Sequence, residues 1–308
     1  YVGYDDKRMG YHNTRLYVMD RDGANRRILT GGLDRSAQSP VWSHDGRSVL
    51  IAYDDHGSTT VARVSLDGAV STLVQGLSGD DIGRPYSGGD FSLADDGSVA
   101  FTRGDALRPA DIHVLRQGRQ TQLTRLNADY LAGKTLGAVQ RLEVASSHDG
   151  RAVESWLTLP AGYVEGQKYP LILEIHGGPF AAYGPHFATD NQLFAAAGYA
   201  VLSVNPRGST SYGEEFANLI HHDYPSHDYD DLIGSVDAVI ARGVADPDRL
   251  FVTGGSGGGV LTAWIVGKTD RFKAAASQKP VIDWASFVLT ADNPAFFARY
   301  WFGEYPWE

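Results

Sequence analysis

The sequence predicts a mostly parallel, doubly wound α/β sheet preceded by part of a β-propeller. Two observations predict this fold class. Hairpin signals recur at a regular spacing over the first part of the chain, and strand-like and helix-like segments alternate over the rest. We place the boundary near residue 140, which divides the chain into residues 1–140 and 141–308. With 43% hydrophobic and 21% charged residues, the composition is that of a globular protein.

Short strands joined by two-residue turns dominate the first part. Turns at 22–23, 67–68 and 117–118 each separate two strand-like runs, and a second type of hairpin turns at 45–46 and 96–97. Most of these turns are Asp-Gly, a strong hairpin signal between alternating strands. The hairpins recur every 45 to 51 residues, a period typical of four-stranded propeller blades. We therefore expect two to three blades; the alternative is a stack of unrelated hairpins.

Strands and helices alternate in the second part, which predicts parallel strands connected by helices. A strand pair around Asp149-Gly150 is expected to open it as an antiparallel hairpin. The further strands are expected at 171–175, 200–204, 250–253 and 273–281, and the helices near 193–197 and at 228–242 and 260–268.

A corner between a strand and a helix carries the candidate nucleophile. Gly254-Gly255-Ser256-Gly257-Gly258 lies between a predicted strand and a predicted helix, the context in which G-x-S-x-G forms a nucleophile elbow. Glycine at Gly254 and Gly258 avoids β-carbons that would crowd the strand and the helix. No lysine follows as in a P-loop, and this is not the first strand-to-helix turn, where a dinucleotide fingerprint sits. Because the chain has 36 glycines, the surroundings of the motif decide its meaning.

A second glycine-rich turn follows the strand expected at 171–175. His176-Gly177-Gly178-Pro179 occupies the place where hydrolases with this elbow position an oxyanion donor. The backbone N–H groups of Gly178 and Gly257 are the predicted donors for an oxyanion formed beside Ser256. The alternative is an ordinary Gly-Pro turn.

Four motifs in this order resemble the catalytic domain of the prolyl oligopeptidase family, in particular its acylaminoacyl-peptidase and dipeptidyl-peptidase-like branch. They are His-Gly-Gly-Pro at 176–179, Asn-Pro-Arg-Gly-Ser at 205–209 followed by Tyr-Gly at 212–213, Asp-Pro-Asp-Arg-Leu at 246–250, and Gly-Gly-Ser at 254–256. The resemblance implies an α/β-hydrolase fold covered by a β-propeller, with short or N-acylated peptides cleaved near their N-terminus through an acyl-enzyme on Ser256. It gives His176, Arg207 and Tyr212 either a substrate-contacting or a structural role. Many relatives carry an aromatic residue where this chain has Gly257, which puts the shape of the pocket in doubt but keeps the backbone donor.

The acid and the base of a serine hydrolase triad are missing from their expected positions. In this fold both follow the serine in the chain, whereas all ten histidines precede Ser256. Asp270 follows too soon after the elbow to serve as the acid. We therefore expect that the triad acid and base are not in this chain, that it is truncated at both ends, and that it is inactive alone. An esterase-type acyl hydrolase and a non-catalytic propeller and hydrolase binding protein are the alternatives.

Bulk properties argue against two classes of partner, while short peptide substrates are what the resemblance implies. The net charge of −10 argues against nucleic acid, and no apolar run reaches the roughly 20 residues of a membrane-spanning helix. There is no cysteine, and no cofactor is expected. A cluster of histidines and aspartates lacks the spacing of a helical zinc pair, so no metal is assigned. Its members are His221, His222, Asp223, His227 and Asp228. The compartment and the oligomeric state, including a homo-oligomer, stay open.

Overall fold

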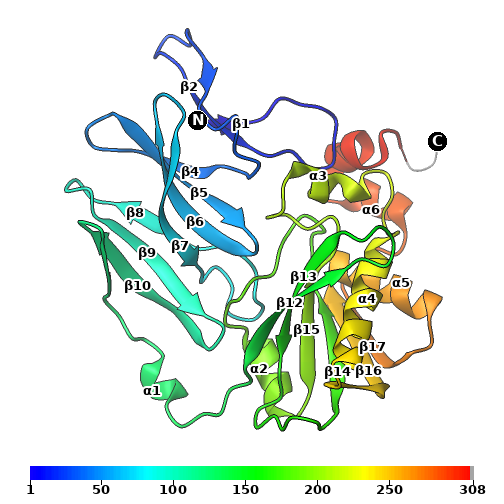
Figure 1. Ribbon diagram of the computed structural model, residues 1–308. Coiled ribbons are helices and arrows are strands. Elements are labelled where there is room, and N and C mark those ends of the chain that lie inside the picture. The colour runs from blue at the N-terminus through cyan, green and yellow to red at the C-terminus, as the bar shows by residue number, and fades with distance from the viewer. Residues whose placement is uncertain (306–308) are drawn as a thin grey trace.

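The computed structural model describes residues 1–305 and shows two parts packed side by side (Figure 1). The N-terminal part consists of antiparallel strands, and the C-terminal part is a mixed sheet flanked by helices. The predicted fold class, a propeller-like antiparallel part followed by an α/β part, is therefore confirmed. Within the described residues, none of the helices combines the length and the apolar character needed to cross a membrane.

The strands of the N-terminal part form two sheets. One sheet holds β1 (Val2–Gly3), β2 (Arg15–Val18) and β3 (Arg27–Ile28). The other runs in the order β11-β10-β9-β7-β6-β5-β4, with β8 paired to β9. Its strands are β4 (Gln38–Trp42), β5 (Ser48–Asp55), β6 (Ser58–Ser65), β7 (Val70–Leu77), β8 (Phe91–Leu93), β9 (Val99–Asp105), β10 (Arg108–Arg116) and β11 (Arg119–Gln122). It consists of two successive four-stranded meanders, β4 to β7 and β8 to β11, which meet at the pair Leu77 and Arg103.

The two central strands of the first meander, β5 and β6, are buried on both faces. Successive side chains of a strand point to opposite faces, and in β5 Val49 and Ile51 belong to one apolar cluster while Leu50 belongs to another. The first cluster includes Leu16 of β2, and the second includes Phe101 of β9. The meander is therefore packed between its neighbours on either side, as a propeller blade is.

The C-terminal part is built on a six-stranded sheet in the order β12-β13-β15-β14-β16-β17. An antiparallel hairpin opens it, β13 pairs antiparallel with β15, and the remaining pairs are parallel. The strands are β12 (Val139–Ala145), β13 (Ala152–Thr158), β14 (Tyr169–Ile175), β15 (Ala200–Asn205), β16 (Ala245–Gly255) and β17 (Phe272–Gln278). Since β15, β14 and β16 are adjacent and parallel, the loops that follow them meet at one edge of the sheet.

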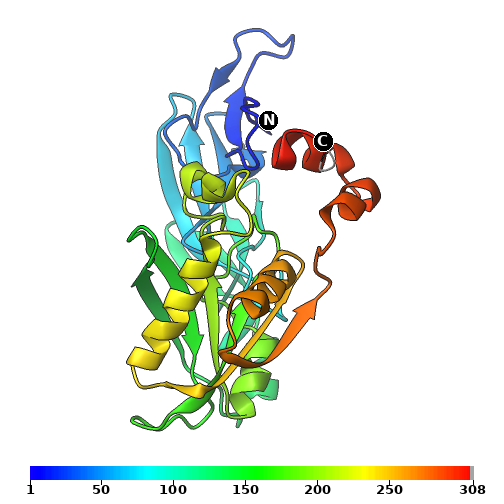
Figure 2. The same cartoon turned by 90° about the vertical axis from the view of Figure 1, so that its right-hand side faces the viewer.

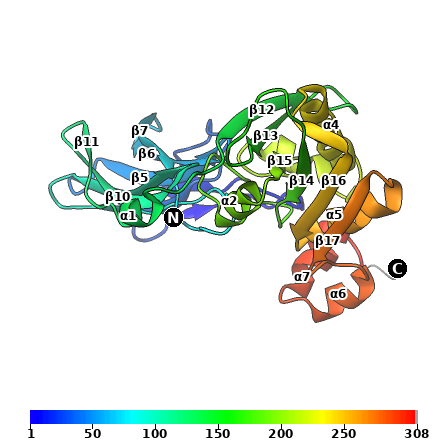
Figure 3. The ribbon, with the colours of Figure 1, turned by 90° about the horizontal axis from the view of Figure 1, so that it is seen from below.

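Helices cover both faces of this sheet. Figure 3 shows α2 (Thr189–Ala196) on the side nearer the N-terminal part, and α4 (Asp228–Ala241) and α5 (Gly257–Lys268) on the other side. Leu232 of α4 and Leu261 of α5 share one apolar core with the strands. The other helical segments are α1 (Ala128–Leu131), α3 (Glu214–Ala217), η1 (Asn218–Ile220), α6 (Trp284–Thr290), α7 (Pro294–Phe296) and η2 (Phe297–Phe302). Most boundaries lie within a few residues of those expected from the sequence, but α5 begins directly after Ser256 because Gly257 to Gly259 are helical.

The two parts contact each other through backbone and side chains. Tyr86, in the loop between β7 and β8, forms an antiparallel bridge with Tyr183. The amide N–H of Asn13 donates to Glu214 Oε2 at 3.0 Å. Figure 2 shows α7 and η2 beside the N-terminal segment, where the Tyr300 hydroxyl donates to Asp6 Oδ2 at 2.9 Å. The N-terminal part therefore lies over the loops at the carboxyl ends of the parallel strands.

Candidate active site

Ser256 lies at a strained corner of the backbone. It follows the last residue of β16 directly and precedes the first residue of α5, and its φ and ψ are 57° and −119°. A positive φ is uncommon for a residue with a side chain and is retained where the surroundings enforce it. The side chain is exposed, whereas Gly254, Gly255, Gly257 and Gly258 are buried. The corner therefore presents the hydroxyl to solvent from an otherwise buried turn.

The glycines on either side of Ser256 have no room for a side chain. A β-carbon on Gly254 would lie 2.5 Å from the carbonyl oxygen of Gly258. One on Gly258 would lie 2.1 Å from the carbonyl oxygen of Ile175, the last residue of β14. Close approach of strand, corner and helix thus requires glycine at both positions.

The turn after β14 packs directly against this corner. A β-carbon on Gly257 would lie 3.0 Å from the carbonyl carbon of Gly178, and one on Gly177 would lie 3.4 Å from the Ser256 β-carbon. Within residues 1–305, the backbone N–H groups of Gly178 and Gly257 have no hydrogen-bond acceptor. The Gly257 N–H also belongs to the first turn of α5, where the helix dipole favours negative charge. The structure therefore brings together Ser256 and both predicted donors.

Two tyrosines that were not predicted from the sequence form hydrogen bonds to the backbone of this site, one to the turn after β14 and one to the corner at Ser256. The Gly177 N–H donates to the Tyr86 hydroxyl at 2.7 Å, and the Tyr224 hydroxyl donates to the Gly257 carbonyl oxygen at 3.0 Å. Tyr86 comes from the N-terminal part and Tyr224 from the loop before α4. Neither residue lies in a motif or a periodic pattern, so the sequence alone carried no signal for them.

An arginine from the N-terminal part reaches the same place. A β-carbon on Gly255 would lie 3.0 Å from Arg84 Nη1, and Arg84 Nη2 donates to Gln278 Oε1 at 3.2 Å. Arg84 Nε also lies 3.3 Å from Glu174 Oε1, although neither carboxylate oxygen of Glu174 has a hydrogen bond of good geometry. Burial raises the pKa of Glu174 to about 7, and the nearby guanidinium of Arg84 opposes this rise. The carboxyl group of Glu174 therefore keeps its proton to a higher pH than an ordinary glutamate does.

His176 is buried and has both ring nitrogens occupied. Nδ1 lies 2.7 Å from the Gly177 carbonyl oxygen and Nε2 lies 2.9 Å from Ser209 Oγ. Burial lowers the pKa of His176 to about 4, so the ring is neutral at pH 7. A neutral ring that donates from Nδ1 to the carbonyl leaves Nε2 as an acceptor. The single proton of the Ser209 hydroxyl is shared between Nε2 and the Pro206 carbonyl oxygen, which lies 2.6 Å from Ser209 Oγ. This geometry supports a structural role in shaping the turn.

Arg207 has its guanidinium in a buried ion-pair network. It donates from Nε to Asp231 Oδ2 at 2.9 Å and from Nη2 to Asp231 Oδ1 at 3.0 Å, and both Nη atoms lie 3.3 Å from Asp149 oxygens. Nη2 also donates to Ser146 Oγ at 3.1 Å. Its side chain is only 5% exposed. These contacts leave little of Arg207 to meet a substrate and support the structural alternative.

Tyr212 is likewise engaged within the protein. Its hydroxyl donates to Glu154 Oε2 at 2.5 Å and accepts from Asn205 Nδ2 at 2.7 Å. Burial, reinforced by the negative charge of Glu154, raises the pKa of Tyr212 well above its ordinary value. Both hydrogen-bonding capacities of the hydroxyl are used, which again supports a structural role.

The Ser256 hydroxyl lacks a base among the residues that the structure describes. No hydrogen bond joins Ser256 Oγ to a side chain in residues 1–305. His176, on the neighbouring turn, uses both nitrogens elsewhere. Among the described residues, the candidate nucleophile and the two candidate oxyanion donors therefore lie together, but no group beside them would accept the proton of the serine.

A cavity of about 410 Å³ lies between the two parts beside the turn after β14. Tyr11, Arg35 and Tyr86 line it from the N-terminal part, and Phe180 and Ser211 line it from the C-terminal part. Ser256 is not among the lining residues. Tyr86 connects the two places, because its hydroxyl binds Gly177 while the same residue lines the cavity. The cavity can therefore hold a part of a ligand that extends away from the elbow.

Known proteins resemble this chain both in sequence and in structure. Residues 185–308 match the Prolyl oligopeptidase family. The uncharacterized peptidase YuxL of Bacillus subtilis is 38% identical over 274 residues, covering 87% of this chain and 40% of that protein. The acylamino-acid-releasing enzyme of Arabidopsis thaliana is 34% identical over 291 residues, covering 85% of this chain and 37% of that protein.

A solved structure extends the likeness to both parts of the fold. The acylaminoacyl peptidase of Pyrococcus horikoshii superimposes with a TM-score of 0.83 at 25% identity, covering 96% of this chain and 45% of that chain. This chain thus spans about 40% of the length of the curated relatives that it matches.

Proposed function

Because this chain is a homologue of the prolyl oligopeptidase family of serine peptidases, related to acylaminoacyl peptidases, we propose that Ser256 is the nucleophile of a peptide-cleaving acyl transfer. One observation carries the proposal. The exposed Ser256, at a φ of 57°, lies beside two backbone N–H groups that have no acceptor within residues 1–305. A serine hydroxyl next to two unused donors is the arrangement that acyl transfer requires.

The arrangement suggests the following course of reaction. Ser256 Oγ forms a bond to the carbonyl carbon of the substrate, and the π electrons of the carbonyl move to its oxygen. Gly178 and Gly257 donate hydrogen bonds to that oxyanion. The proton of the serine passes to a base and then to the departing amine, and the carbon–nitrogen bond breaks to leave an acyl-enzyme. Water then attacks the ester and releases the acyl part, which regenerates the hydroxyl.

The base and its orienting acid are proposed to come from polypeptide outside residues 1–308. All ten histidines precede Ser256 in the chain, and the described ones are not bonded to it. The curated relatives are more than twice as long as the matched region. In addition, β17 is an edge strand whose residues are exposed from Lys273 to Gln278, so further strands can pair with it. On this proposal the chain of 308 residues is inactive alone.

The proposed substrates are short or N-acylated peptides cleaved near their N-terminus. The cavity beside the oxyanion turn is lined on one side by the propeller-like part, and we propose that this part limits the size of what can enter. The name of the Arabidopsis relative describes release of acylated amino acids, which favours an acyl group as one occupant of the site. A simple esterase shares the nucleophile elbow but lacks a propeller over its active site, so the propeller-like part favours a peptidase.

Covalent labelling tests the nucleophile. A fluorophosphonate reacts with an activated serine, so a longer form of the protein that includes the missing acid and base should be labelled at Ser256. Peptide mapping by mass spectrometry identifies the residue. Ser256→Ala should abolish labelling, and the chain of 308 residues should be labelled at a small fraction of the rate. Labelling that persists unchanged in Ser256→Ala contradicts the assignment.

Chromogenic substrates distinguish the substrate classes. The longer form should hydrolyse an acyl-alanyl or a free dipeptidyl substrate faster than a plain ester of the same leaving group. Faster hydrolysis of the plain ester alone would favour an acyl hydrolase of the esterase type. If neither class is turned over and Ser256 is not labelled, the protein is a non-catalytic binding protein.

A further inference from the structure

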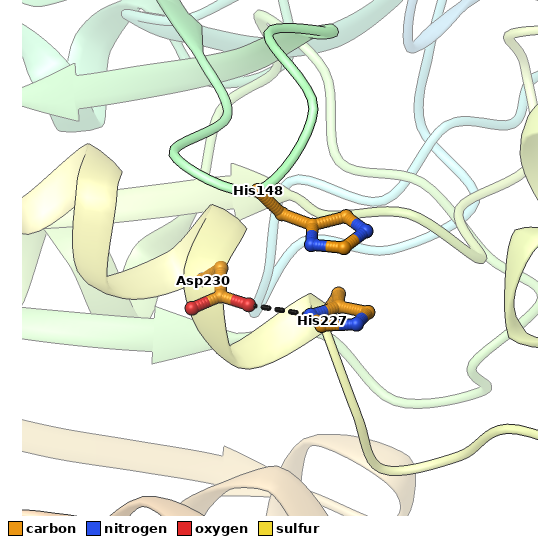
Figure 4. Close-up of side chains that lie close together, drawn as sticks. All are labelled: His148, His227 and Asp230. Atoms are coloured by element: carbon orange, nitrogen blue, oxygen red, sulfur yellow. Dashed lines mark hydrogen bonds and ion pairs between the residues drawn. The ribbon is translucent and has the colours of Figure 1, made fainter.

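Three side chains from two separate segments of the C-terminal part lie close together at its surface. His148 lies in the turn between β12 and β13, and His227 and Asp230 lie at the start of α4. Figure 4 shows the two imidazole rings stacked, with Asp230 beside His227. The ring centroids are 3.4 Å apart at an interplanar angle of 14°, and His227 Nδ1 lies 2.7 Å from Asp230 Oδ2.

The geometry of these three side chains suits a metal ion. One ring nitrogen of each histidine and one carboxylate oxygen of Asp230 all lie within 4.8 Å of one another. Zinc-like ions bind imidazole nitrogen and carboxylate oxygen at about 2.0–2.2 Å. The rings must tilt apart so that both nitrogen lone pairs point at one ion. His148 is exposed and His227 is partly exposed, so this adjustment requires no rearrangement of the core.

A buried network already fixes the two elements that carry these side chains. Arg207 binds Asp149, the residue after His148, and Asp231, the residue after Asp230. The same guanidinium donates to Ser146 in the turn that holds His148. One arginine thus clamps the turn to the helix just beneath the three side chains. The backbone positions of the three side chains are therefore set before an ion binds.

The charge of the surroundings favours a cation. Asp149 and Asp231 adjoin the ligands in sequence, and among the described residues their ion-pair partners are Arg207 and Arg151. Arg151 is also paired with Glu215 at 2.8 Å. Two stacked imidazoles repel each other when both are protonated, whereas neutral imidazoles are the form that binds metals.

We propose that His148, His227 and Asp230 form a binding site for a divalent transition-metal ion of the zinc type. Water completes the coordination at the exposed side of the ion. The ion binds one ring nitrogen of each histidine, in the unprotonated form that coordinates metals, and one carboxylate oxygen of Asp230. The spacing within the sequence gave no sign of this site, because His148 is far from the other two ligands along the chain.

The position of the site connects it to the nucleophile elbow. His227 is followed by α4 and preceded by the segment of Tyr224, whose hydroxyl binds the carbonyl oxygen of Gly257. Ser226 in that segment donates its N–H to Asp228 in the first turn of α4 at 2.9 Å. An ion that fixes the start of α4 therefore also fixes the support of Gly257, one of the proposed oxyanion donors. This consequence rests on the proposed function, but metal binding itself does not.

Metal binding to the purified chain of 308 residues tests the site directly. Calorimetric titration with Zn²⁺ should give one saturable site per chain, and Co²⁺ at the same site should show the intense visible absorption of a low-coordinate complex. His148→Ala should weaken binding at least tenfold, in line with the effect of losing even an indirect metal partner. His148 is exposed, so this variant keeps the fold. Asp230→Asn should weaken binding as well while keeping the hydrogen bond to His227.

The chain offers a matched control in a second stacked histidine pair. His221 and His222 have ring centroids 3.9 Å apart, and no carboxylate completes a group with them among the described residues. His222→Ala should leave the Zn²⁺ affinity unchanged. The proposal is overturned if no saturable binding occurs, or if His222→Ala removes it while His148→Ala does not. Both outcomes are independent of peptidase activity, so failure of the metal site leaves the proposed function standing.

Discussion

Close approach of three backbone segments determines which residue types can stand on either side of Ser256. The ends of β14 and β16 and the start of α5 meet at Gly254 and Gly258, where a β-carbon would overlap a carbonyl oxygen. The identity of these residues therefore follows from packing, while the proposed reactivity of Ser256 rests on its exposed side chain and on two neighbouring N–H groups that have no acceptor within residues 1–305. This is why the motif could be recognised from the sequence.

Replacing Gly258 by alanine tests the packing at the corner. The new β-carbon would lie 2.1 Å from the Ile175 carbonyl oxygen, so the backbone must shift, and we expect a loss of about 3 kcal/mol or more in the free energy of unfolding. Gly267 in the same helix is the matched control, since nothing lies within 4 Å of its added β-carbon. Gly267→Ala should stabilise by about 0.5–1 kcal/mol. Urea unfolding of the two variants measures both effects, and equal stabilities would contradict the account of the corner.

Glu174 should make stability fall as the pH rises. Burial raises the pKa of its carboxyl group from 4.5 to about 7, so the folded state keeps a proton that the unfolded state loses near pH 4.5. The stability that this proton contributes is complete below about pH 4.5 and is lost between there and pH 7, by about 3 kcal/mol in all. Glu174→Gln should remove this loss, so its advantage over the unaltered protein grows up to pH 7 and then stays constant.

The exposed Glu143 provides the comparison for this measurement. Its side chain is 61% exposed, so Glu143→Gln should leave the dependence of stability on pH unchanged. Unfolding curves at intervals from pH 4.5 to 8 give the free energies. Parallel profiles for Glu174→Gln and the unaltered protein would show that the carboxyl group is not buried as described.

Among the elements, the β12–β13 turn and α4 depend on one buried arginine. Asp231 in α4 is 1% exposed and Arg207 is 5% exposed. Removing one partner of a buried pair leaves the other charge without compensation. Arg207 therefore determines how the opening hairpin sits against the helix, and with it the arrangement of His148 over His227.

Arg207→Ala is expected to lower the free energy of unfolding by about 3–5 kcal/mol, because it leaves Asp231 buried and unpaired. Arg151 is the control. It also pairs with Asp149, but its side chain is 41% exposed, so Arg151→Ala should cost less than about 1 kcal/mol. Urea unfolding again gives both values. A small effect of Arg207→Ala would mean that solvent reaches Asp231.

Most helices and strands could be predicted from the sequence, whereas contacts to the site from distant parts of the chain could not. The Asp-Gly hairpins and the alternation of strands and helices are local signals, and the structure has strands and helices close to the predicted ranges. The elbow and the turn after β14 are local too. By contrast, Arg84, Tyr86 and His148 reach their partners across long stretches of chain. No spacing in the sequence records such contacts, because they depend on how the two parts and the hairpin dock.

The whole molecule contributes to the site through the N-terminal part. Its loop between β7 and β8 places Tyr86 against the turn after β14 and Arg84 beside the elbow, and it lines the cavity between the two parts. The propeller-like part is therefore more than a cover, since it holds the backbone that carries the proposed oxyanion donor Gly178.

Tyr86→Phe tests this coupling between the two parts. Loss of the hydroxyl leaves the Gly177 N–H without its acceptor, and the hydrogen bond is worth about 0.5–1.5 kcal/mol. In a longer, active form of the protein, fluorophosphonate labelling of Ser256 should slow by up to about tenfold. Tyr130→Phe is the control, because that side chain is 72% exposed on α1. Equal labelling rates for the two variants would show that the N-terminal part does not position the turn.

A crystal structure of the longer protein after reaction with a fluorophosphonate tests the central claim most directly. The account predicts phosphorus bound to Ser256 Oγ, with the phosphoryl oxygen about 2.7–3.1 Å from the backbone nitrogens of both Gly178 and Gly257. A phosphorus atom on another residue, or a phosphoryl oxygen turned away from these two nitrogens, would contradict it.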